Sequence, residues 1–228
     1  MVVAAMPSEL RPFSKSLRLR RTNVAGTAVR TGRVGTAEVA GVVIGIGPVS
    51  ASQATERIFA AMAVEKVVVI GIAGGLVSSQ RIGDLVVPET VIDGSTGVER
   101  RPAPLTDLPV VGSLWTSGEL ILDGARLAAL AERGVVALDM ETAAVAEVCE
   151  EQDCPWSVVR AVSDHPRDGW VDATVLELTR PDGRPDLFAV ARRLARHPGD
   201  VPRLARLGRD ATRAAEASAR AAIRSLQA

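Results

Sequence analysis

The chain has 228 residues, 47% hydrophobic and 24% charged, a composition that suits one packed α/β domain and excludes extended disorder. Lysine plus arginine and aspartate plus glutamate both number 27, so the global charge gives no reason to expect a nucleic-acid partner. We expect a cytoplasmic protein, because no apolar run reaches the roughly 18 residues of a membrane span, no signal peptide is recognisable, and the only cysteines are Cys149 and Cys154.

Short runs rich in valine, isoleucine and alanine predict buried strands in the first half of the chain. These strands are expected at Val2–Met6, Thr27–Arg33, Ala37–Ile46 and Val67–Ile72. Pro48–Ala63 is predicted to be a helix, because Pro48 stands near its start, where a missing N–H costs no hydrogen bond. Glu9 follows the first strand, in a predicted loop.

The second half of the chain continues the alternation of strands and helices. Further strands are expected at Asp84–Val87, Thr90–Ile92, Val110–Trp115 and Trp156–Val162, with a surface loop at Arg100–Pro109. Helices are expected at Leu120–Arg133, Met140–Gln152, Asp186–Arg196 and Val201–Leu226. The pattern predicts a single α/β domain over residues 1–228, with a mixed central β-sheet flanked by helices. Residues 183–228 are expected to form an arginine-rich helical tail packed on it.

Two glycine-rich turns follow predicted strands. Gly45-Ile46-Gly47 has the start of a dinucleotide-binding turn, but Ser50 stands where the third glycine is needed, which favours an ordinary tight turn. The run Gly71-Ile72-Ala73-Gly74-Gly75 puts four small residues at the end of a buried strand, where the backbone can approach a ligand closely. A plain glycine turn is the alternative interpretation.

Acidic residues stand where predicted elements begin or end. Asp139 and Glu141 lie at a predicted helix start, where the helix dipole stabilises negative charge. Asp164 ends the predicted strand that contains Arg160. Each of these acids has a purely structural interpretation as a cap, and Glu9 alone would be an unremarkable surface acid.

In this order and spacing, these pieces resemble the purine nucleoside phosphorylase and nucleosidase superfamily, close to the methylthioadenosine/S-adenosylhomocysteine nucleosidases. The matching motifs are Ala5-Met6-x-x-Glu9, Gly45-Ile46-Gly47, Gly71-x-Ala73-Gly74-Gly75 with Gly83-Asp84, Asp139-Met140-Glu141-x-Ala143-Ala144, and Val159-Arg160-Ala161-x-Ser163-Asp164. They cover residues 1–165, and the ordered set is specific although each motif alone is not. The resemblance implies a nucleoside-phosphorylase-like fold and cleavage of the bond between ribose and adenine.

The resemblance also implies roles for the matched residues. Asp164 corresponds to the acid that protonates the departing base, which its site must keep protonated, and Glu9 to the acid that activates water. Glu141 corresponds to the carboxylate that holds the ribose hydroxyls. The other matched residues would either contact substrate, as Met140, Gly74, Ile121 and Ser163, or orient the acids, as Arg160 and Asp139.

The chain departs from the family pattern at positions that bear on the reaction. Ile72 replaces a serine of the glycine-rich turn, and Ile121 stands where the family usually has an aromatic ring to stack on the base. Phosphorylases of the superfamily hold phosphate with arginines and a hydroxyl. Arg11 corresponds to the first arginine, but Val69 and Ile72 replace the later pair, and phosphate is poorly held without such donors. The residues therefore favour water as the acceptor, whereas the assignment of the family favours phosphate, so the acceptor stays open between the two.

The tail carries a second, narrower resemblance. Arg180–Leu187, Arg196–Gly199 and Leu204–Leu207 resemble the hopanoid-associated members of the superfamily, which are assigned to removing adenine from adenosylhopane. A lipid substrate would need an open 5′ end of the pocket, which the loop Arg100–Pro109 and the polar stretch after Asp164 are placed to form.

Arginines gather along one side of the last predicted helix, within about 120° at 100° per residue, opposite leucine and alanine. Such a helix suits peripheral contact with anionic lipid at the inner membrane surface. The alternative is that its apolar side packs on the protein's own core while the arginines face water.

The sequence leaves three functions open. The first is an enzyme that removes adenine from a 5′-substituted adenosine, adenosylhopane in its narrower form. The second is a methylthioadenosine/S-adenosylhomocysteine or futalosine-type nucleosidase. The third is a catalytically silent adenine-nucleoside binding protein, against which the joint presence of Glu9, Glu141 and Asp164 speaks. No cofactor is expected, His165 and His197 are too few and too isolated for a metal site, and the resemblance implies a homodimer or higher homo-oligomer.

Overall fold

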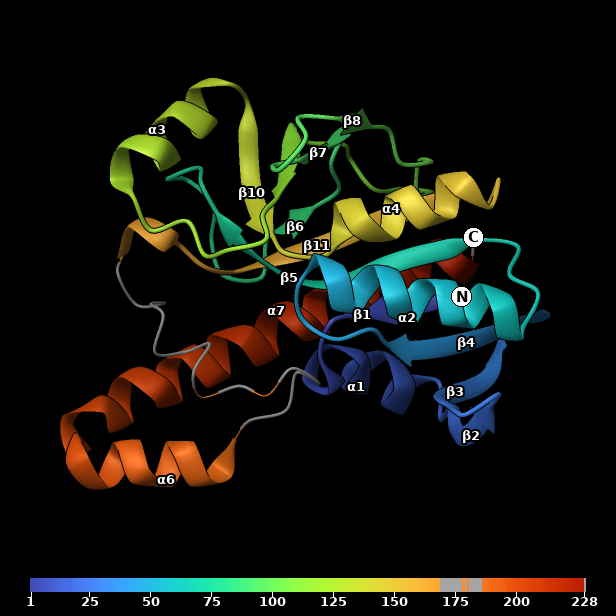
Figure 1. The fold of residues 1–228 in the computed structure, drawn as a ribbon, viewed down its shortest axis with the longest axis horizontal. Coiled ribbons are helices and arrows are strands. Elements are labelled where there is room, and N and C mark those ends of the chain that lie inside the picture. Colours follow the sequence, from blue (N-terminus) through green and yellow to red (C-terminus); the bar gives the residue numbers. More distant parts are fainter. Residues whose placement is uncertain (169–177, 179, 181–185, 228) are drawn as a thin grey trace.

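An 11-stranded mixed sheet forms the centre of the computed structural model, which describes residues 1–168, 178, 180 and 186–227 (Figure 1). The strands are β1 (Val2–Ala4), β2 (Arg20–Val24), β3 (Thr27–Val34), β4 (Ala37–Val43), β5 (Val67–Gly75), β6 (Leu85–Val86), β7 (Thr90–Asp93), β8 (Glu99–Arg100), β9 (Ser113–Thr116), β10 (Val135–Asp139) and β11 (Trp156–Asp164). The helices are α1 (Pro7–Ser16), α2 (Pro48–Ala61), α3 (Gly124–Glu132), α4 (Thr142–Glu151), α6 (Leu187–Arg196) and α7 (Val201–Gln227), with short 3₁₀ helices η1 (Pro166–Asp168) and η2 (Pro198–Asp200).

β5 lies at the centre of the sheet. It pairs in parallel with β1 and with β11, and antiparallel with β10 at its own carboxyl end, where Leu138 faces Gly74. Its run Val67–Ile70 is buried on both faces, which explains why it is continuously apolar. Because β5 and β11 run in parallel, their carboxyl ends reach the same edge of the sheet, where ligands of open α/β sheets bind.

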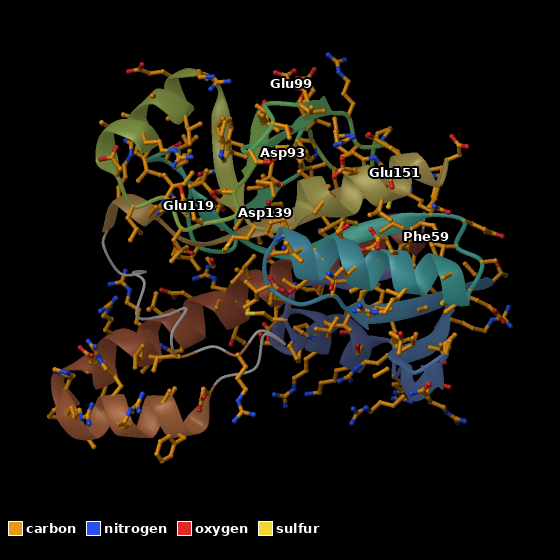
Figure 2. The ribbon with its side chains drawn as sticks, in the orientation of Figure 1. Phe59, Asp93, Glu99, Glu119, Asp139 and Glu151 are labelled. Atoms are coloured by element: carbon orange, nitrogen blue, oxygen red, sulfur yellow. The ribbon has the colours of Figure 1, made fainter. Side chains whose placement is uncertain are left out.

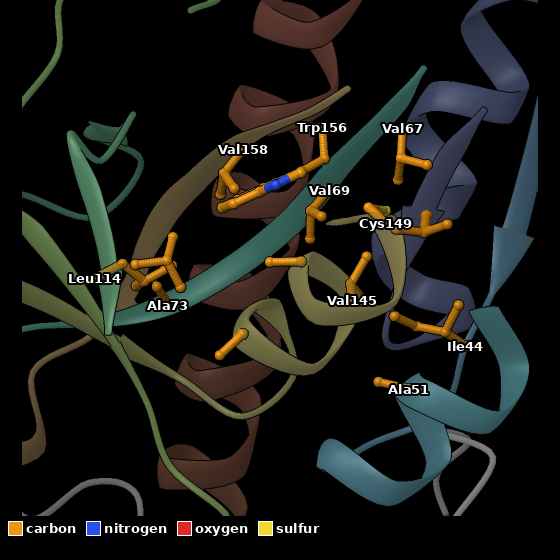
Figure 3. Close-up of a cluster of buried hydrophobic side chains, with 14 of the residues drawn as sticks. Ile44, Ala51, Val67, Val69, Ala73, Leu114, Val145, Cys149, Trp156 and Val158 are labelled. Atoms are coloured by element: carbon orange, nitrogen blue, oxygen red, sulfur yellow. The ribbon is translucent and has the colours of Figure 1, made fainter. Parts of the chain in front are cut away.

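Helices cover both faces of the sheet, and alternate residues of β5 face two separate hydrophobic cores. On one face α2 and α4 pack together, and Figure 3 shows Ala51 of α2 and Cys149 of α4 with Trp156 of β11 in this core. On the other face α1 and α7 pack together, and Phe13 and Ala222 contribute to the second core. Both cysteines are free and buried.

The structure confirms the predicted fold class and corrects several elements. Glu9 lies in helix α1 instead of a loop: Pro7 occupies its first turn, where proline is tolerated, but Pro12 inside the helix hides the helical pattern. No strand is predicted at β2 or β10. Strand β2 is almost wholly exposed and lacks the apolar alternation by which strands are recognised. Strand β10 is short and ends just before α4, so from the sequence its residues are interpreted as the approach to that helix.

Several boundaries also differ from the predictions. Helix α3 begins at Gly124 instead of Leu120, because the Asp123 carboxylate accepts the N–H of Arg126 at 2.7 Å and caps the helix. Helix α4 begins at Thr142, which leaves Glu141 in the N-cap position. The loop at 100–109 is not wholly at the surface, since Leu105 is buried in the core below α1 and α7.

The last helix, α7, has two different halves. From Ala214 onward Ser218 and every alanine of α7 except the half-buried Ala217 are buried, and this half packs on α1, β5 and β11. Residues 201–213 extend away from the sheet beside α6 (Figure 1). None of the helices in the described part of the chain is long and apolar enough to cross a membrane. Residues 183–185 and most of the polar stretch after Asp164 lie outside the described residues.

Candidate active site

The candidate active site is built around one buried cation, Arg160 of β11. Its guanidinium is 1% exposed and faces three carboxylates. Nη2 lies 2.5 Å from Asp139 Oδ2 and 3.4 Å from Glu141 Oε2, and Nη1 lies 3.7 Å from Glu9 Oε1. A buried charge is tolerated only with such partners, so these four residues form one electrostatic unit, which we call the Arg160 cluster.

Asp139 holds Arg160 in place. Its carboxylate also accepts hydrogen bonds from Thr116 Oγ1 at 2.6 Å, from the backbone N–H of Thr142 at 3.1 Å, and from the Thr142 hydroxyl. With the guanidinium, these donors number four, three on Oδ2 and one on Oδ1, and a carboxylate accepts about four in all. Figure 2 shows Asp139 at the carboxyl end of β10, beside Glu119. This saturation supports an orienting role for Asp139.

Backbone donors hold both carboxylate oxygens of Glu9, in the first turn of α1. Oε2 accepts the N–H of Met6 at 2.7 Å, and Oε1 accepts the N–H of Ile72 at 2.9 Å. Burial raises the pKa of Glu9, against the opposing effects of Arg160 and of these donors. Gly71, at a φ of +144°, lies against this carboxylate, and a Cβ there would overlap Glu9 Oε1 and Arg160 Nη1. Because Gly71 has no side chain, the charged groups of Glu9 and Arg160 can approach each other at this point of β5.

Glu141 meets the other glycine-rich turn. Its Oε1 accepts the N–H of Gly47 at 3.0 Å, so the turn Gly45-Ile46-Gly47 positions a carboxylate. Burial raises the pKa of Glu141 to about 7, with Arg160 opposing the shift and Asp139 adding to it. Glu141 therefore exchanges its proton near neutral pH.

A cavity of about 100 Å³ opens beside the Arg160 cluster, at the carboxyl ends of β5, β10 and β11. Its lining combines apolar walls with a few acids, and consists of Gly74, Ser117, Glu119, Leu120, Ile121, Leu122, Leu138, Asp139, Met140, Asp164 and Pro166. This mixture is typical of a small-molecule site. Asp139 belongs to both the cavity and the cluster, and through it Glu9 and Glu141 connect to the cavity wall.

Asp164, at the end of β11, faces the cavity next to a glycine. Ser163 Oγ donates to Asp164 Oδ1 at 2.6 Å, and Oδ2 lies 3.6 Å from where a Cβ of residue 74 would stand. That Cβ would also press on Pro166 Cγ at 3.1 Å. Gly74 therefore keeps the space in front of Asp164 clear.

The structure brings most of the predicted site residues together and separates one. Met140, Ile121, Gly74 and Asp164 line one cavity, and Ser163 contacts Asp164. Arg11 is exposed on α1 and is not among the described residues that line this cavity. The predicted phosphate contact of Arg11 therefore gains no support from its position. The loop at 100–109 lines a different cavity, with Val87, Pro88 and Val158, and is not among the described residues that line this one.

Sequence reasoning missed Ser218, in the middle of α7. Its buried hydroxyl donates to the carbonyl of Val159 at 2.7 Å and accepts the N–H of Gly71 at 3.0 Å. It therefore bridges β5 and β11 beside Arg160. Ser218 and Gly71 are 147 residues apart, and one serine in an alanine-rich helix gives no signal of this contact.

His165 also gains a role that the sequence does not indicate. Its Nδ1 lies 3.1 Å from the carbonyl oxygen of Gly75, and its Nε2 lies 3.1 Å from that of Gln80. The ring thus fixes the backbone just after Asp164 to the end of β5.

Comparison with known proteins identifies the family of this chain. The family model described as "Phosphorylase superfamily" matches residues 1–108 and 106–196. The chain belongs to the phosphorylase superfamily. A 5′-methylthioadenosine/S-adenosylhomocysteine nucleosidase of Bacillus thuringiensis (strain Al Hakam) is 28% identical over 194 residues, which cover 72% of this chain and 84% of that relative.

Solved structures share the superfamily fold seen here. The 5′-methylthioadenosine/S-adenosylhomocysteine nucleosidase of Helicobacter pylori, solved with a pyrrolidine ligand, has a TM-score of 0.73 and 17% identity, covering 98% of this chain and 95% of that one. The futalosine hydrolase of the same organism has a TM-score of 0.72 and 17% identity, covering 99% and 95%. A Borrelia burgdorferi protein described as such a nucleosidase and bound to adenine has a TM-score of 0.73 and 16% identity, covering 99% and 97%.

Proposed function

We propose that this protein cleaves the N-glycosidic bond between adenine and the ribose of a 5′-substituted adenosine. The observation that carries the proposal is that the acid Asp164 lines a cavity beside the Arg160 cluster. In that cluster Glu9 and Glu141 both face Arg160, and both have raised pKa values. Breaking this bond builds positive charge on the ribose and negative charge on the departing purine. It is therefore assisted by a proton donor at the base and by carboxylates at the sugar.

Each residue has a step that its surroundings suit. Asp164 donates a proton to the departing adenine, while its bond from Ser163 fixes the carboxyl group. Glu141, as a carboxylate, accepts the ribose hydroxyls, and Met140 packs beside the sugar. Glu9, with a pKa raised by burial, removes a proton from the attacking water, because a stronger base accepts it more readily. Arg160 and Asp139 position both glutamates.

We infer that water is the acceptor. Phosphate binding needs cationic or hydroxyl donors, and Val69 and Ile72 offer apolar side chains where those donors are expected. The relatives that carry the word nucleosidase in their names support the same choice. Added phosphate should then leave the rate unchanged, and the sugar product should be the 5′-substituted ribose with a free hydroxyl at C1′, with no sugar phosphate formed.

We further propose that the 5′ substituent is a long apolar group, as in adenosylhopane. The tail segments that resemble the hopanoid-associated members support this, as do Leu120 and Leu122 in the cavity lining, the latter 45% exposed. Burying hydrocarbon contributes about 25 cal/mol per Å², so affinity should rise with 5′ chain length. A methylthioadenosine/S-adenosylhomocysteine or futalosine-type nucleosidase is the alternative.

We also propose that the working form is a homodimer in which the partner forms part of the wall on the 5′ side of the cavity and leaves its end open. An exposed leucine at the cavity rim supports this, because apolar rims of open sites are commonly covered in oligomers. Light scattering tests it, and a fully active monomer would contradict it.

The decisive experiment replaces the proton donor. Asp164→Asn should lower adenine release by about 10²- to 10⁴-fold while adenine still binds, because the change removes a proton donor and little volume. Asp107→Asn, in an exposed loop, is the matched control and should keep the wild-type rate. An Asp164→Asn enzyme with normal turnover would place the acid elsewhere.

The same assay separates the alternatives. Adenine release is measured from adenosines with 5′-methylthio, 5′-hexylthio and 5′-dodecylthio groups, with and without phosphate. A steep rise in kcat/KM with chain length supports the lipid-type substrate, and equal or better cleavage of methylthioadenosine supports the alternative nucleosidase. Binding without any release from the wild type would indicate the silent binding protein.

A further inference from the structure

The net charge of zero hides a strong separation of charge along the chain. Residues 10–37 contain seven lysines and arginines and no aspartate or glutamate. Residues 186–227 contain nine arginines against four acids. Residues 38–182 carry the compensating excess, with 22 acids against ten basic residues. The two basic segments are far apart in the sequence, so their relative position in the fold decides whether they act together.

The fold puts the two basic segments on one side of the molecule. Figure 1 shows the β2–β3 hairpin, α1 and α6 in succession along its lower margin, with α7 packed on α1. Arg18, Arg20 and Arg21 are exposed at the β2–β3 end, and Arg192 and Arg196 are exposed at the α6 end. We call this side the basic face.

The basic residues of the segment 10–37 lie between the first turns of α1 and the end of β3. None of the seven basic residues in 10–37 makes an ion pair with any residue that the structure describes. At the α6 end some arginines are paired, as Arg193 with Asp200 at 2.6 Å, while Arg192 lies 5.9 Å from the Phe188 ring centre. Unpaired surface cations on one side create a positive potential that attracts an anionic surface.

Apolar side chains accompany these cations. Phe188 of α6 is 75% exposed and Val201, at the start of α7, is 49% exposed. A helix with an exposed aromatic ring among arginines is typical of helices that lie in the lipid headgroup region. A nucleic-acid backbone would satisfy the arginines but leave Val201 in water. No helix of the described part spans a bilayer, so the contact would be peripheral.

We propose that the basic face binds the surface of an anionic lipid bilayer, with Phe188 and Val201 inserted at the headgroup level. The cations of the β2–β3 end and of α6 contact the lipid headgroups at opposite ends of the face. This inference rests on charge and exposure alone and does not depend on the proposed function. It would bring the enzyme to the phase that holds a lipid-linked substrate.

The test uses the full chain and vesicles without any nucleoside, so its failure is distinguishable from failure of the proposed function. Flotation is measured with phosphatidylcholine vesicles and with vesicles containing 30% phosphatidylglycerol, at about 0.15 M and about 0.5 M salt. We expect binding to the anionic vesicles only, and its loss at high salt. Equal binding to both vesicles, or no binding to either, would overturn the proposal.

Variants assign the binding to this face. Neutralising the three cations in Arg18→Gln/Arg20→Gln/Arg21→Gln should weaken vesicle binding on the order of a hundredfold, since each basic residue near the surface contributes about fivefold. Phe188→Ser should also weaken vesicle binding, but should change the salt dependence of binding less than the triple arginine variant does. The matched control Arg57→Gln/Arg101→Gln/Arg126→Gln removes equal charge from α2, the segment after β8 and α3, and should bind like the wild type.

Two results would reject the bilayer as the partner. One is a loss of vesicle binding in the control triple variant as large as in the basic-face triple variant, which would mean that binding depends on total charge and not on this face. The other is binding to a 30-nucleotide RNA that is tighter than to anionic vesicles at about 0.15 M salt. The melting temperature of each variant of the basic face should match that of the wild type, which verifies that each is folded.

Discussion

The Arg160 cluster and the cavity beside it share Asp139 but are built under different physical constraints. In the cluster every charged group is almost wholly excluded from water and is held by fixed donors and acceptors. In the cavity Asp164 and Met140 are partly exposed, and the walls are largely apolar. Replacements in the cluster should therefore act on folding as well as on activity, whereas replacements in the cavity should act on the ligand.

Arg160→Gln should break the cluster and have the largest effect. It leaves three buried carboxylates without their cation, and removal of one partner from a buried ion pair costs about 3–5 kcal/mol. Urea unfolding at pH 7.5 measures the loss. Arg220→Gln, whose pair with Glu216 is exposed, should cost less than about 1 kcal/mol. Equal losses in the two variants would mean that the cluster is not an energetic unit.

The residues of the cluster show what sequence can and cannot predict. The motifs around Glu9, Glu141 and Arg160 are local in sequence, and the resemblance they carry identifies them together with the fold class. The contacts among them are not local: Glu9 meets Ile72 and Arg160 because β1, β5 and β11 lie side by side. The periodicity of the sequence does not encode which strands pair. From the sequence the glycine-rich β5 turn is therefore interpreted as a ligand site, whereas in the structure Gly71 makes room for the side chains of Glu9 and Arg160.

Glu141→Gln should remove a pH dependence that the cluster imposes. The pKa of Glu141 is about 7 in the folded protein and 4.5 as its ordinary value, so between these pH values the folded state keeps a proton that the unfolded state loses. Its contribution to stability is complete below pH 4.5 and is lost as the pH rises through 7, by on the order of 3 kcal/mol.

The measurement for Glu141→Gln is the free energy of unfolding of both proteins at pH 5, 6, 7 and 8. The wild type should lose stability relative to the variant as the pH rises. Parallel curves would show that Glu141 has no raised pKa. The kcat/KM of the wild type should rise through the same pH range, because only the carboxylate accepts the ribose hydroxyls.

Ser218→Ala should destabilise the backbone that supports the Arg160 cluster and lower the free energy of unfolding. The change leaves the N–H of Gly71 and the carbonyl of Val159 without their shared hydroxyl, and buried unsatisfied groups cost about 1–3 kcal/mol. Thermal unfolding measures this, and the control Thr212→Ala, an exposed hydroxyl bonded within α7, should cost less than about 0.5 kcal/mol. Turnover should fall as well, since Gly71 leads directly to the Ile72 N–H that holds Glu9. Loss of stability without loss of turnover would show that the contact from α7 does not influence the active site.

Ile121→Phe should act on the cavity alone and have the smallest effect. Ile121 is 5% exposed in the cavity wall, at the position where the family has an aromatic ring. A ring stacked on adenine adds about 0.5–1.5 kcal/mol, which corresponds to a two- to tenfold lower inhibition constant for adenine. The larger ring would extend into the cavity of about 100 Å³ and not into the packed core, so the melting temperature should stay near that of the wild type. Ile121→Leu keeps the volume without the ring and should bind adenine like the wild type. Because the ring adds an interaction only where the base lies, weaker adenine binding by Ile121→Phe would mean that the purine occupies another part of the cavity.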